Sequence, residues 1–489
     1  MRKGNLVSGE WNAIVHFGLF GIAIGLLTPI AVEQVAGGKN LWLALVPLAL
    51  PVLLVMALRP VLGAAAVIGF GFVNPSLLPP LIEVGPLSLR SVDGVFCLFI
   101  GMVLARSVIS RRAAILIEVR ELFAPLMLFL LYIGLSLVFV RISAPDFIGA
   151  SVASYMRLML TAAFVPALCV TVRDKWDIEF LNKALIFFAM ATVVVGSARV
   201  WTGGDAVLAG RSGGVIGIGA LGLVSGLLII YAAIERDGKR RSMAWIFSLA
   251  VGLLGLYLAK TASAAIAVAA TAGLYFASMR SRRFDLVRWA VVGTIMTTAA
   301  ALAVWTARPD DVSGLVNSGG GSFAQRLMIA YTGISIFLDN PLIGVGWQAS
   351  TAEAVIGSPA AIASVRDRFP QLVPENLLFT PPSTLHNMYI QFLAELGIIG
   401  FALFGWVCLR TGRKVARIVK SIPAESPYRV WAQFYALGLI YLLIWWNNSA
   451  LFGGQIEALL AFTFLALLAN VAQLERQRVE QMPAINRKI

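Results

Sequence analysis

His386 and the residues after it are the first candidates for chemistry in this 489-residue chain. Asn387, Gln391 and Glu395 follow at steps of four, so a helix would align them as one polar stripe on an otherwise apolar surface, with Tyr389 beside it. A histidine near neutral pH can accept a proton from a hydroxyl nucleophile. The segment therefore predicts either a site that activates a hydroxyl or a helix-packing stripe whose polar groups bind their neighbours.

Four arginines are the second candidates, because they fall in segments that the rest of the chain predicts to lie outside the cytoplasm. Arg211 stands in Gly-Arg-Ser-Gly-Gly, Arg326 begins an amphipathic stretch, and Arg366 and Arg368 follow in the same long segment. Guanidinium groups bind phosphate oxygens in bidentate fashion and keep their charge. Together they predict a site for a diphosphate. For Arg366 and Arg368, each taken singly, a surface contact or a contact with lipid headgroups is the favoured interpretation.

The composition shows what kind of scaffold must position these residues. Hydrophobic residues make up 59% of the chain and charged residues 13%, whereas soluble proteins carry about 25% charged residues. A soluble protein of this size could not cover so much apolar surface. We therefore expect an all-α polytopic membrane protein. The net charge of +14 is explained by basic cytoplasmic loops, so no nucleic acid is expected as a partner.

Apolar runs long enough to cross a bilayer predict twelve to fourteen transmembrane helices. Fourteen candidates lie at residues 13–32, 41–57, 61–82, 91–108, 123–141, 151–171, 180–200, 215–234, 243–259, 261–278, 287–305, 388–408, 431–447 and 452–471. The third is interrupted by Asn74-Pro75 and Pro79-Pro80, and the tenth follows the ninth almost without a loop. Because either of these two candidates could fail to be a separate span, the expected number of transmembrane helices ranges from twelve to fourteen.

The distribution of basic residues orients the predicted bundle. With both termini in the cytoplasm, 28 of the 39 Lys and Arg residues fall in inner segments and ten in outer ones, while Arg157 lies inside a span. This agrees with the positive-inside rule. The orientation places residues 306–386, a segment too long for a simple helix connection, outside the cytoplasm. We expect a large loop outside the cytoplasm there, in a multi-pass membrane protein.

Other kinds of site have no support in the sequence. No cluster of His, Cys and carboxylate residues has the spacing of metal ligands, and no glycine-rich loop of the nucleotide-binding type occurs. No Ser or Cys stands in a motif for covalent catalysis. We expect neither a metal nor a cofactor.

Two segments together indicate a family. Arg326 followed by residues 341–347 (PLIGVGW, here called the PLIGVGW loop) resembles an arginine-then-PLxGVGW pattern of the O-antigen ligase and O-antigen polymerase superfamily. Residues 386–400 are similar to the superfamily's segment after its large periplasmic loop, and Arg211 resembles a third arginine site. The resemblance covers residues 210–408. Where the family often has a Ser-Arg pair, this chain has Lys260 followed by Thr261, so Lys260 would supply a point charge.

The resemblance implies a metal-independent, inverting glycosyltransferase in a bacterial inner membrane, with its active site and the large loop 306–386 at the periplasmic face. The donor would be a glycan on undecaprenyl diphosphate, and the acceptor a saccharide hydroxyl on lipid A-core or on a growing polysaccharide. Arg211 and Arg326 would hold the diphosphate and His386 would deprotonate or orient the hydroxyl. Asn387, Tyr389 and Glu395 would support them, and membrane lipids would surround the bundle.

This organisation is a single membrane domain, 1–489, in three parts: N-terminal helices at 1–209, a ligase-like core at 210–408 that includes loop 306–386, and C-terminal helices with a cytoplasmic tail at 409–489. The sequence leaves ligase and polymerase open. A flippase or transporter of lipid-linked glycans is a more distant alternative, for which Arg157 and the interrupted third span are the only indications. A scaffold without turnover would leave the contexts of Arg326 and His386 unexplained.

Overall fold

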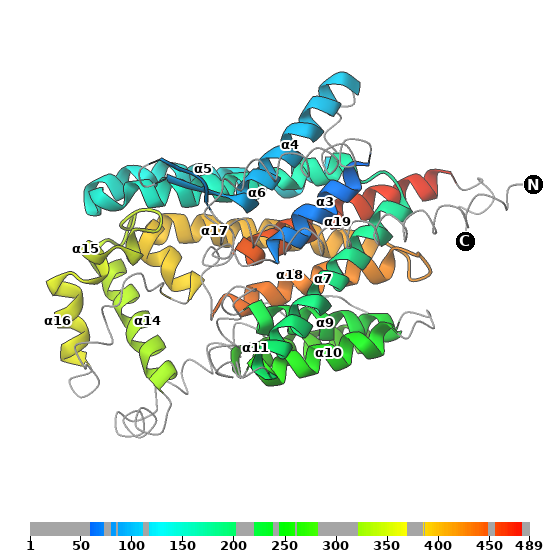
Figure 1. The fold of residues 1–489 in the computed structure, drawn as a ribbon. Coiled ribbons are helices and arrows are strands. Elements are labelled where there is room, and N and C mark those ends of the chain that lie inside the picture. The colour runs from blue at the N-terminus through cyan, green and yellow to red at the C-terminus, as the bar shows by residue number, and fades with distance from the viewer. Residues whose placement is uncertain are drawn as a thin grey trace, which may run out of the picture. The chain divides into compact units, whose positions relative to one another are not determined.

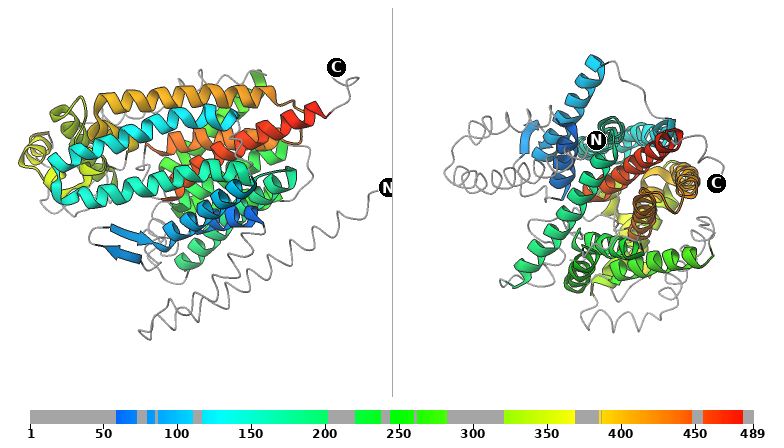
Figure 2. Two further views of the ribbon diagram at one scale, coloured as in Figure 1. Left: turned by 90° about the horizontal axis from the view of Figure 1, so that it is seen from above. Right: turned by 90° about the vertical axis from the view of Figure 1, so that its right-hand side faces the viewer.

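The computed structural model describes residues 59–72, 80–84, 87–110, 117–201, 220–237, 244–259, 262–281, 321–368, 385, 387–447 and 455–481. These residues are overwhelmingly helical, as Figures 1 and 2 show. The expected all-α class is confirmed, with one short β hairpin as its exception. By backbone contacts, Ala64–Ile489 forms one compact unit and Met1–Gly63 another.

The helices follow the predicted apolar runs closely where both can be compared. They are α3 (Pro60–Gly71), α4 (Ser91–Ser110), α5 (Ile117–Ser143), α6 (Ile148–Thr171), α7 (Lys175–Trp201), α9 (Ala220–Asp237), α10 (Ala244–Ala259), α11 (Ala262–Ser281), α14 (Gly321–Asp339), α15 (Glu353–Ile356), α16 (Pro359–Arg368), α17 (Met388–Ser421), α18 (Arg429–Trp445) and α19 (Gln455–Glu480). Short 3-10 turns lie at Pro145–Phe147 and Ala349–Thr351. The predicted spans at 13–32, 41–57 and 287–305 lie outside the described residues.

Several helices are long and apolar enough to cross a membrane, which makes this a multi-pass membrane protein. Within the described ranges there are five: Arg120–Ser143, Pro145–Thr171, Lys175–Ser197, Met388–Ser421 and Ile456–Glu480. Shorter apolar helices accompany them, among them α10 and α18. Helix α19 is the central one, since 94% of its most apolar window is buried. It packs against α6 and α18.

The third predicted span, 61–82, differs from the structure. Helix α3 ends at Gly71, and Pro80–Val84 forms strand β1, which pairs antiparallel with β2 (Leu87–Arg90). Three prolines in this segment, Pro75, Pro79 and Pro80, remove amide donors that a continuous helix would need. An apolar run alone does not distinguish a helix from a strand, and here the prolines decide.

Two segments that position the candidate site also differ from simple expectations. Helix α17 continues past the predicted end at residue 408 to Ser421. Within the predicted loop 306–386, helices α14, α15 and α16 are formed, so much of its described part is ordered structure. Figures 1 and 2 show these three helices at the end of the bundle where α5 ends and α17 begins.

Candidate functional site

Helix α17 begins with a well-defined N-cap at Asn387. The Asn387 side-chain oxygen accepts hydrogen bonds from the amides of Tyr389 (3.0 Å) and Ile390 (3.1 Å), two of the donors that a helix start leaves unsatisfied. Its Nδ2 donates to the carbonyl of Asn447 (2.9 Å). The Tyr389 hydroxyl donates to the carbonyl of Leu443 (2.6 Å). Asn387 and Tyr389 therefore fasten the start of α17 to the end of α18.

Helix α17 is broken after its second turn, and the PLIGVGW loop fills the break. Gly397 has φ 62° and ψ −171°, which no helix permits. In an unbroken helix, the amides of residues 398 and 399 would donate to the carbonyls of residues 394 and 395. Here they donate to the carbonyls of Pro341 and Leu342, while the amides of Val345 and Gly346 donate to the carbonyls of Ala394 and Glu395.

This exchange of backbone hydrogen bonds explains the glycines of both segments. A Cβ on Gly344 would lie 2.3 Å from the carbonyl carbon of Glu395, and one on Gly397 would lie 2.3 Å from that of Leu342. Both residues also have positive φ, as does Gly346. Only glycine combines that backbone conformation with so close an approach. The two sequence segments that carried the family resemblance thus interlock through their main chains.

Glu395 is buried at this junction and binds the protein itself. Its Oε1 accepts hydrogen bonds from Ser350 Oγ (2.6 Å) and Gln391 Nε2 (2.9 Å), and the amide of Gln348 also donates to its carboxylate. Gln348 has φ 63°, a left-handed conformation that costs a non-glycine residue about 1–2 kcal/mol. These contacts match the helix-packing alternative for Gln391 and Glu395. Glu395 is a positioning residue for the end of the PLIGVGW loop.

Helix α5 contributes polar contacts to the junction that sequence reasoning missed. The Tyr132 hydroxyl donates to the carbonyl of Leu396 (3.0 Å), next to the break. Ser136 Oγ accepts from the amide of Trp347 (3.2 Å), and Ser143 Oγ donates to the carbonyl of Val345. The three polar residues lie four and seven positions apart, on one face of an apolar helix. That spacing is the signal that could have found them.

Helix α14 packs against the start of α17. Gly333 lies so close that a Cβ there would sit 2.6 Å from Ile390 Cγ2 and 2.9 Å from Leu385 Cδ1. Ile329 and Leu385 belong to one buried cluster that also contains Val345 of the PLIGVGW loop. The structure therefore brings together α14, which carries Arg326, and the residues on either side of position 386.

The remaining predicted site residues are placed only in part. Arg211, Lys260 and His386 lie outside the described residues. Arg326 stands in the first half of α14 and Arg368 at the end of α16. Arg366, on α16, is exposed. The roles assigned to all of these residues stay predictions.

A metal site has no candidate ligands in the part of the chain that the structure describes, where no group of three His, Cys, Asp or Glu residues comes together. Arg157, one of the two indications of a transporter, has a structural partner. Its Nε lies 3.1 Å from Asp93 Oδ2, and this ion pair joins α6 to α4. A buried carboxylate needs such a partner, which gives Arg157 a role that does not involve transport.

Comparison with known proteins agrees with the geometry. Residues 247–405 match the family model described as O-antigen ligase. The matched region runs from α10 through the PLIGVGW loop to the first half of α17, so it includes Arg326 and position 386 but not Arg211. The search of curated proteins finds no match.

Proposed function

We propose, from the match of residues 247–405 to the O-antigen ligase family model, that this protein transfers a glycan from undecaprenyl diphosphate to a saccharide hydroxyl at the periplasmic face of a bacterial inner membrane. The observation that carries the proposal is the interlocking of the PLIGVGW loop with the break in α17. It holds the two motif segments of the predicted site in one rigid junction.

The placement of α14 supports a shared site for Arg326 and His386. Positions 326, 329 and 333 are spaced three and four apart, so they fall on one helical face. Gly333 and Ile329 on this face pack with Leu385, which directly precedes His386. Position 326 is two turns from Gly333, about 10 Å along the axis. That separation suits a diphosphate and a sugar lying between the two residues.

The proposed reaction needs charge stabilisation at one end and proton removal at the other. The acceptor hydroxyl attacks the anomeric carbon as its proton passes to His386, and the bond from that carbon to the diphosphate oxygen breaks with inversion. Negative charge grows on undecaprenyl diphosphate as it leaves, and Arg326 and Arg211 stabilise it by bidentate hydrogen bonds. Lys260 adds a point charge. No metal takes part in this scheme.

The described contacts support precise placement of the proposed base. Asn387 caps α17 immediately after position 386, and Tyr389 fastens the same turn to α18. Catalytic groups must keep near-attack geometry, since small displacements cost large factors in rate. Arg366 is exposed on α16, so we propose that it and Arg368 contact the donor glycan or headgroups rather than the reacting atoms.

The test is glycosyl transfer by purified protein with a synthetic undecaprenyl-diphosphate oligosaccharide and a saccharide acceptor. We expect Arg326→Ala to lower kcat about 10²–10³-fold and His386→Ala about 10²–10⁴-fold. The turnover of Arg326→Lys should also stay low, because the lysine ammonium is a point charge and cannot form the two parallel hydrogen bonds that a guanidinium forms with a phosphate. Arg120→Ala, which removes an exposed arginine of α5, is the matched control and should keep full activity.

The same assay separates the alternatives. Unchanged turnover in both Arg326→Ala and His386→Ala would show that these residues do not form the active site. Turnover in detergent, where no gradient exists, would exclude a purely transporting protein. A ladder of products from a single repeat-unit donor would identify a polymerase, and a single transfer would identify a ligase.

A further inference from the structure

A cavity of about 590 Å³ lies between α5, α6, α17, α18 and α19, and no residue of the PLIGVGW loop lines it. Most of its wall is apolar, and its large side chains include Phe129, Leu158, Phe404, Trp446, Phe462 and Leu465. Along α17 it extends from Phe404 to Lys420, about 24 Å at the helical rise of 1.5 Å per residue. One leaflet of a bilayer has a hydrocarbon depth of about 15 Å, so a lipid chain fits this length.

One end of this cavity is strongly basic. Arg413, Arg417 and Lys420 line it, and their spacing of four and three places them on one face of α17. All three side chains are exposed. The nearby acidic residue Glu121 forms its ion pair with Lys414 and interacts more weakly with Arg417. The basic end therefore keeps a large excess of positive charge.

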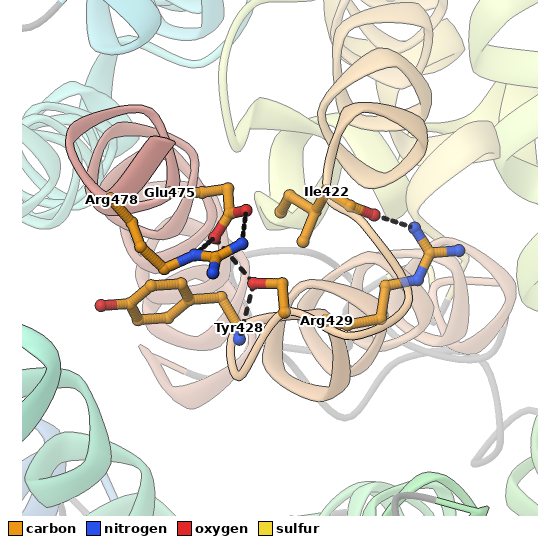
Figure 3. A network of polar contacts seen from close by, with 6 residues as sticks. Ile422, Tyr428, Arg429, Glu475 and Arg478 are labelled. Atoms are coloured by element: carbon orange, nitrogen blue, oxygen red, sulfur yellow. Dashed lines mark hydrogen bonds and ion pairs between the residues drawn. The ribbon is translucent and has the colours of Figure 1, made fainter. Parts of the chain in front are cut away.

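These cations are not needed to terminate α17. Arg429 performs that task, since its Nη1 donates to the carbonyl of Ile422 (Figure 3) and also to that of Val419, both at the end of the helix. The turn into α18 is also fixed, because Ser426 Oγ donates to Glu475 Oε2 (2.7 Å) and Arg478 forms an ion pair with Glu475. The end of α17 and the turn into α18 are thus held by other residues, and Arg413, Arg417 and Lys420 remain available for a ligand.

We propose that this cavity binds an anionic phospholipid, with an acyl chain among the apolar side chains and the phosphate at Arg413, Arg417 and Lys420. An apolar cavity with several cationic side chains at one end is complementary to a molecule with a hydrocarbon chain and a negatively charged headgroup. Basic pockets between transmembrane helices bind such headgroups, and each nearby Lys or Arg contributes to the attraction. The predicted orientation places this end in the cytoplasmic leaflet, where positive residues concentrate.

The proposed glycan donor does not fit the same place. From Ile398, directly after the break, to Arg413 the second part of α17 alone rises about 22 Å at 1.5 Å per residue, and the proposed base lies before the break. The diphosphate of the donor cannot reach the basic end while its sugar is at position 386. The bound phospholipid is therefore a second ligand, separate from the proposed reaction, and its binding is measured without any donor.

The experiment is native mass spectrometry and thermal unfolding of the delipidated full chain, titrated with dioleoylphosphatidylglycerol or dioleoylphosphatidylcholine in mild detergent. The wild type should bind one phosphatidylglycerol in preference to phosphatidylcholine and unfold at a higher temperature when it is bound. The variant Arg413→Gln/Arg417→Gln/Lys420→Gln should lose at least tenfold in affinity. The charge control is Arg410→Gln, which removes a cation stacked on Trp406 outside the cavity and should bind as the wild type does.

A second pair of variants tests the apolar part. Ala416→Phe fills the cavity and should weaken phosphatidylglycerol binding, whereas Ala402→Phe, at an exposed position of the same helix, should not. Equal affinity for the two lipids, or unchanged binding in the triple variant, would overturn the proposal. Preferential binding of undecaprenyl phosphate over phosphatidylglycerol would overturn it as well, because the cavity would then hold a prenyl tail. The triple variant replaces only exposed side chains, so the result stands even if Ala416→Phe fails to fold.

Discussion

At the scale of single residues, Glu395 shows how a polar group inside an apolar helix can have a structural purpose. It has no exposed surface, and one of its oxygens accepts hydrogen bonds from two side chains. Its partners Gln348 and Ser350 directly follow the PLIGVGW loop, so the carboxylate holds the end of that loop against α17. A buried donor left without an acceptor costs about 1–3 kcal/mol, which makes this contact expensive to lose.

Replacing Glu395 with alanine should therefore lower stability, because Ser350, Gln391 and the amide of Gln348 all lose their acceptor. We expect Glu395→Ala to reduce the free energy of unfolding by roughly 2 kcal/mol or more. Glu395→Gln retains an oxygen of the same reach and should lose less. The measurement is thermal unfolding in detergent, with Glu353→Ala, at an exposed position of α15, as the control. If Glu395→Ala unfolded at the wild-type temperature, the hydrogen bonds of Glu395 would not contribute to the stability of the fold.

At the scale of elements, the break in α17 is a fixed feature of the fold. A helix broken inside a membrane leaves amides and carbonyls that must find partners within the protein. The PLIGVGW loop provides four of these bonds, and Tyr132 of α5 provides another at the carbonyl of Leu396. The break turns a simple span into a junction of α5, α17 and the segment after α14.

Gly397→Ala should disrupt this junction, because the residue has positive φ and its Cβ would meet the backbone of Leu342. We expect a loss of about 3 kcal/mol or more in the free energy of unfolding, or failure to fold. The matched control is Gly405→Ala in the same helix, where a Cβ meets nothing within 4 Å and helix propensity should raise stability by up to about 1 kcal/mol. Thermal unfolding checks both variants, and equal behaviour of the two would contradict the role of the break.

At the scale of the whole molecule, the distribution of charge sets the orientation in the membrane. The basic face of α17 near Lys420 belongs to the predicted cytoplasmic side, and α16 belongs to the predicted periplasmic loop. Both proposals depend on this orientation, since the glycan donor is expected outside and the phospholipid headgroup inside. The two ends of α17 would then serve different leaflets.

Cysteine labelling in intact cells checks the orientation directly. In a background with Cys97, Cys169 and Cys408 replaced by serine, a membrane-impermeant maleimide should label Arg366→Cys from outside the inner membrane. It should label Lys420→Cys only after the membrane is permeabilised. Both positions are exposed, so access to solvent is not limiting. The reverse pattern would invert the bundle and place the predicted loop in the cytoplasm.

The sequence by itself predicted the class of the protein, most of the described helices and the two segments that meet in the junction. Long apolar runs predict helices reliably because a bilayer permits few other structures for them. The interlocking of residues 341–347 with residues 394–399 could not be predicted, since it depends on main-chain hydrogen bonds between distant segments, which leave no periodic pattern. The glycines could be recognised in the sequence as part of a motif. The sequence did not show which backbone segment each glycine approaches.

Tertiary structure also decided which polar residues bind other parts of the protein and which line a cavity. Glu395 looked equivalent to the other members of its stripe in the sequence, and only its burial against Ser350 separates it from Asn387 at the helix start. Likewise, Lys414 and Arg417 are both basic residues of one helix, yet Lys414 faces Glu121 and Arg417 lines a cavity. The sequence determines the kind and order of the helices through local hydrophobicity. The partner of each polar group depends on how those helices pack, which is a property of the folded chain alone.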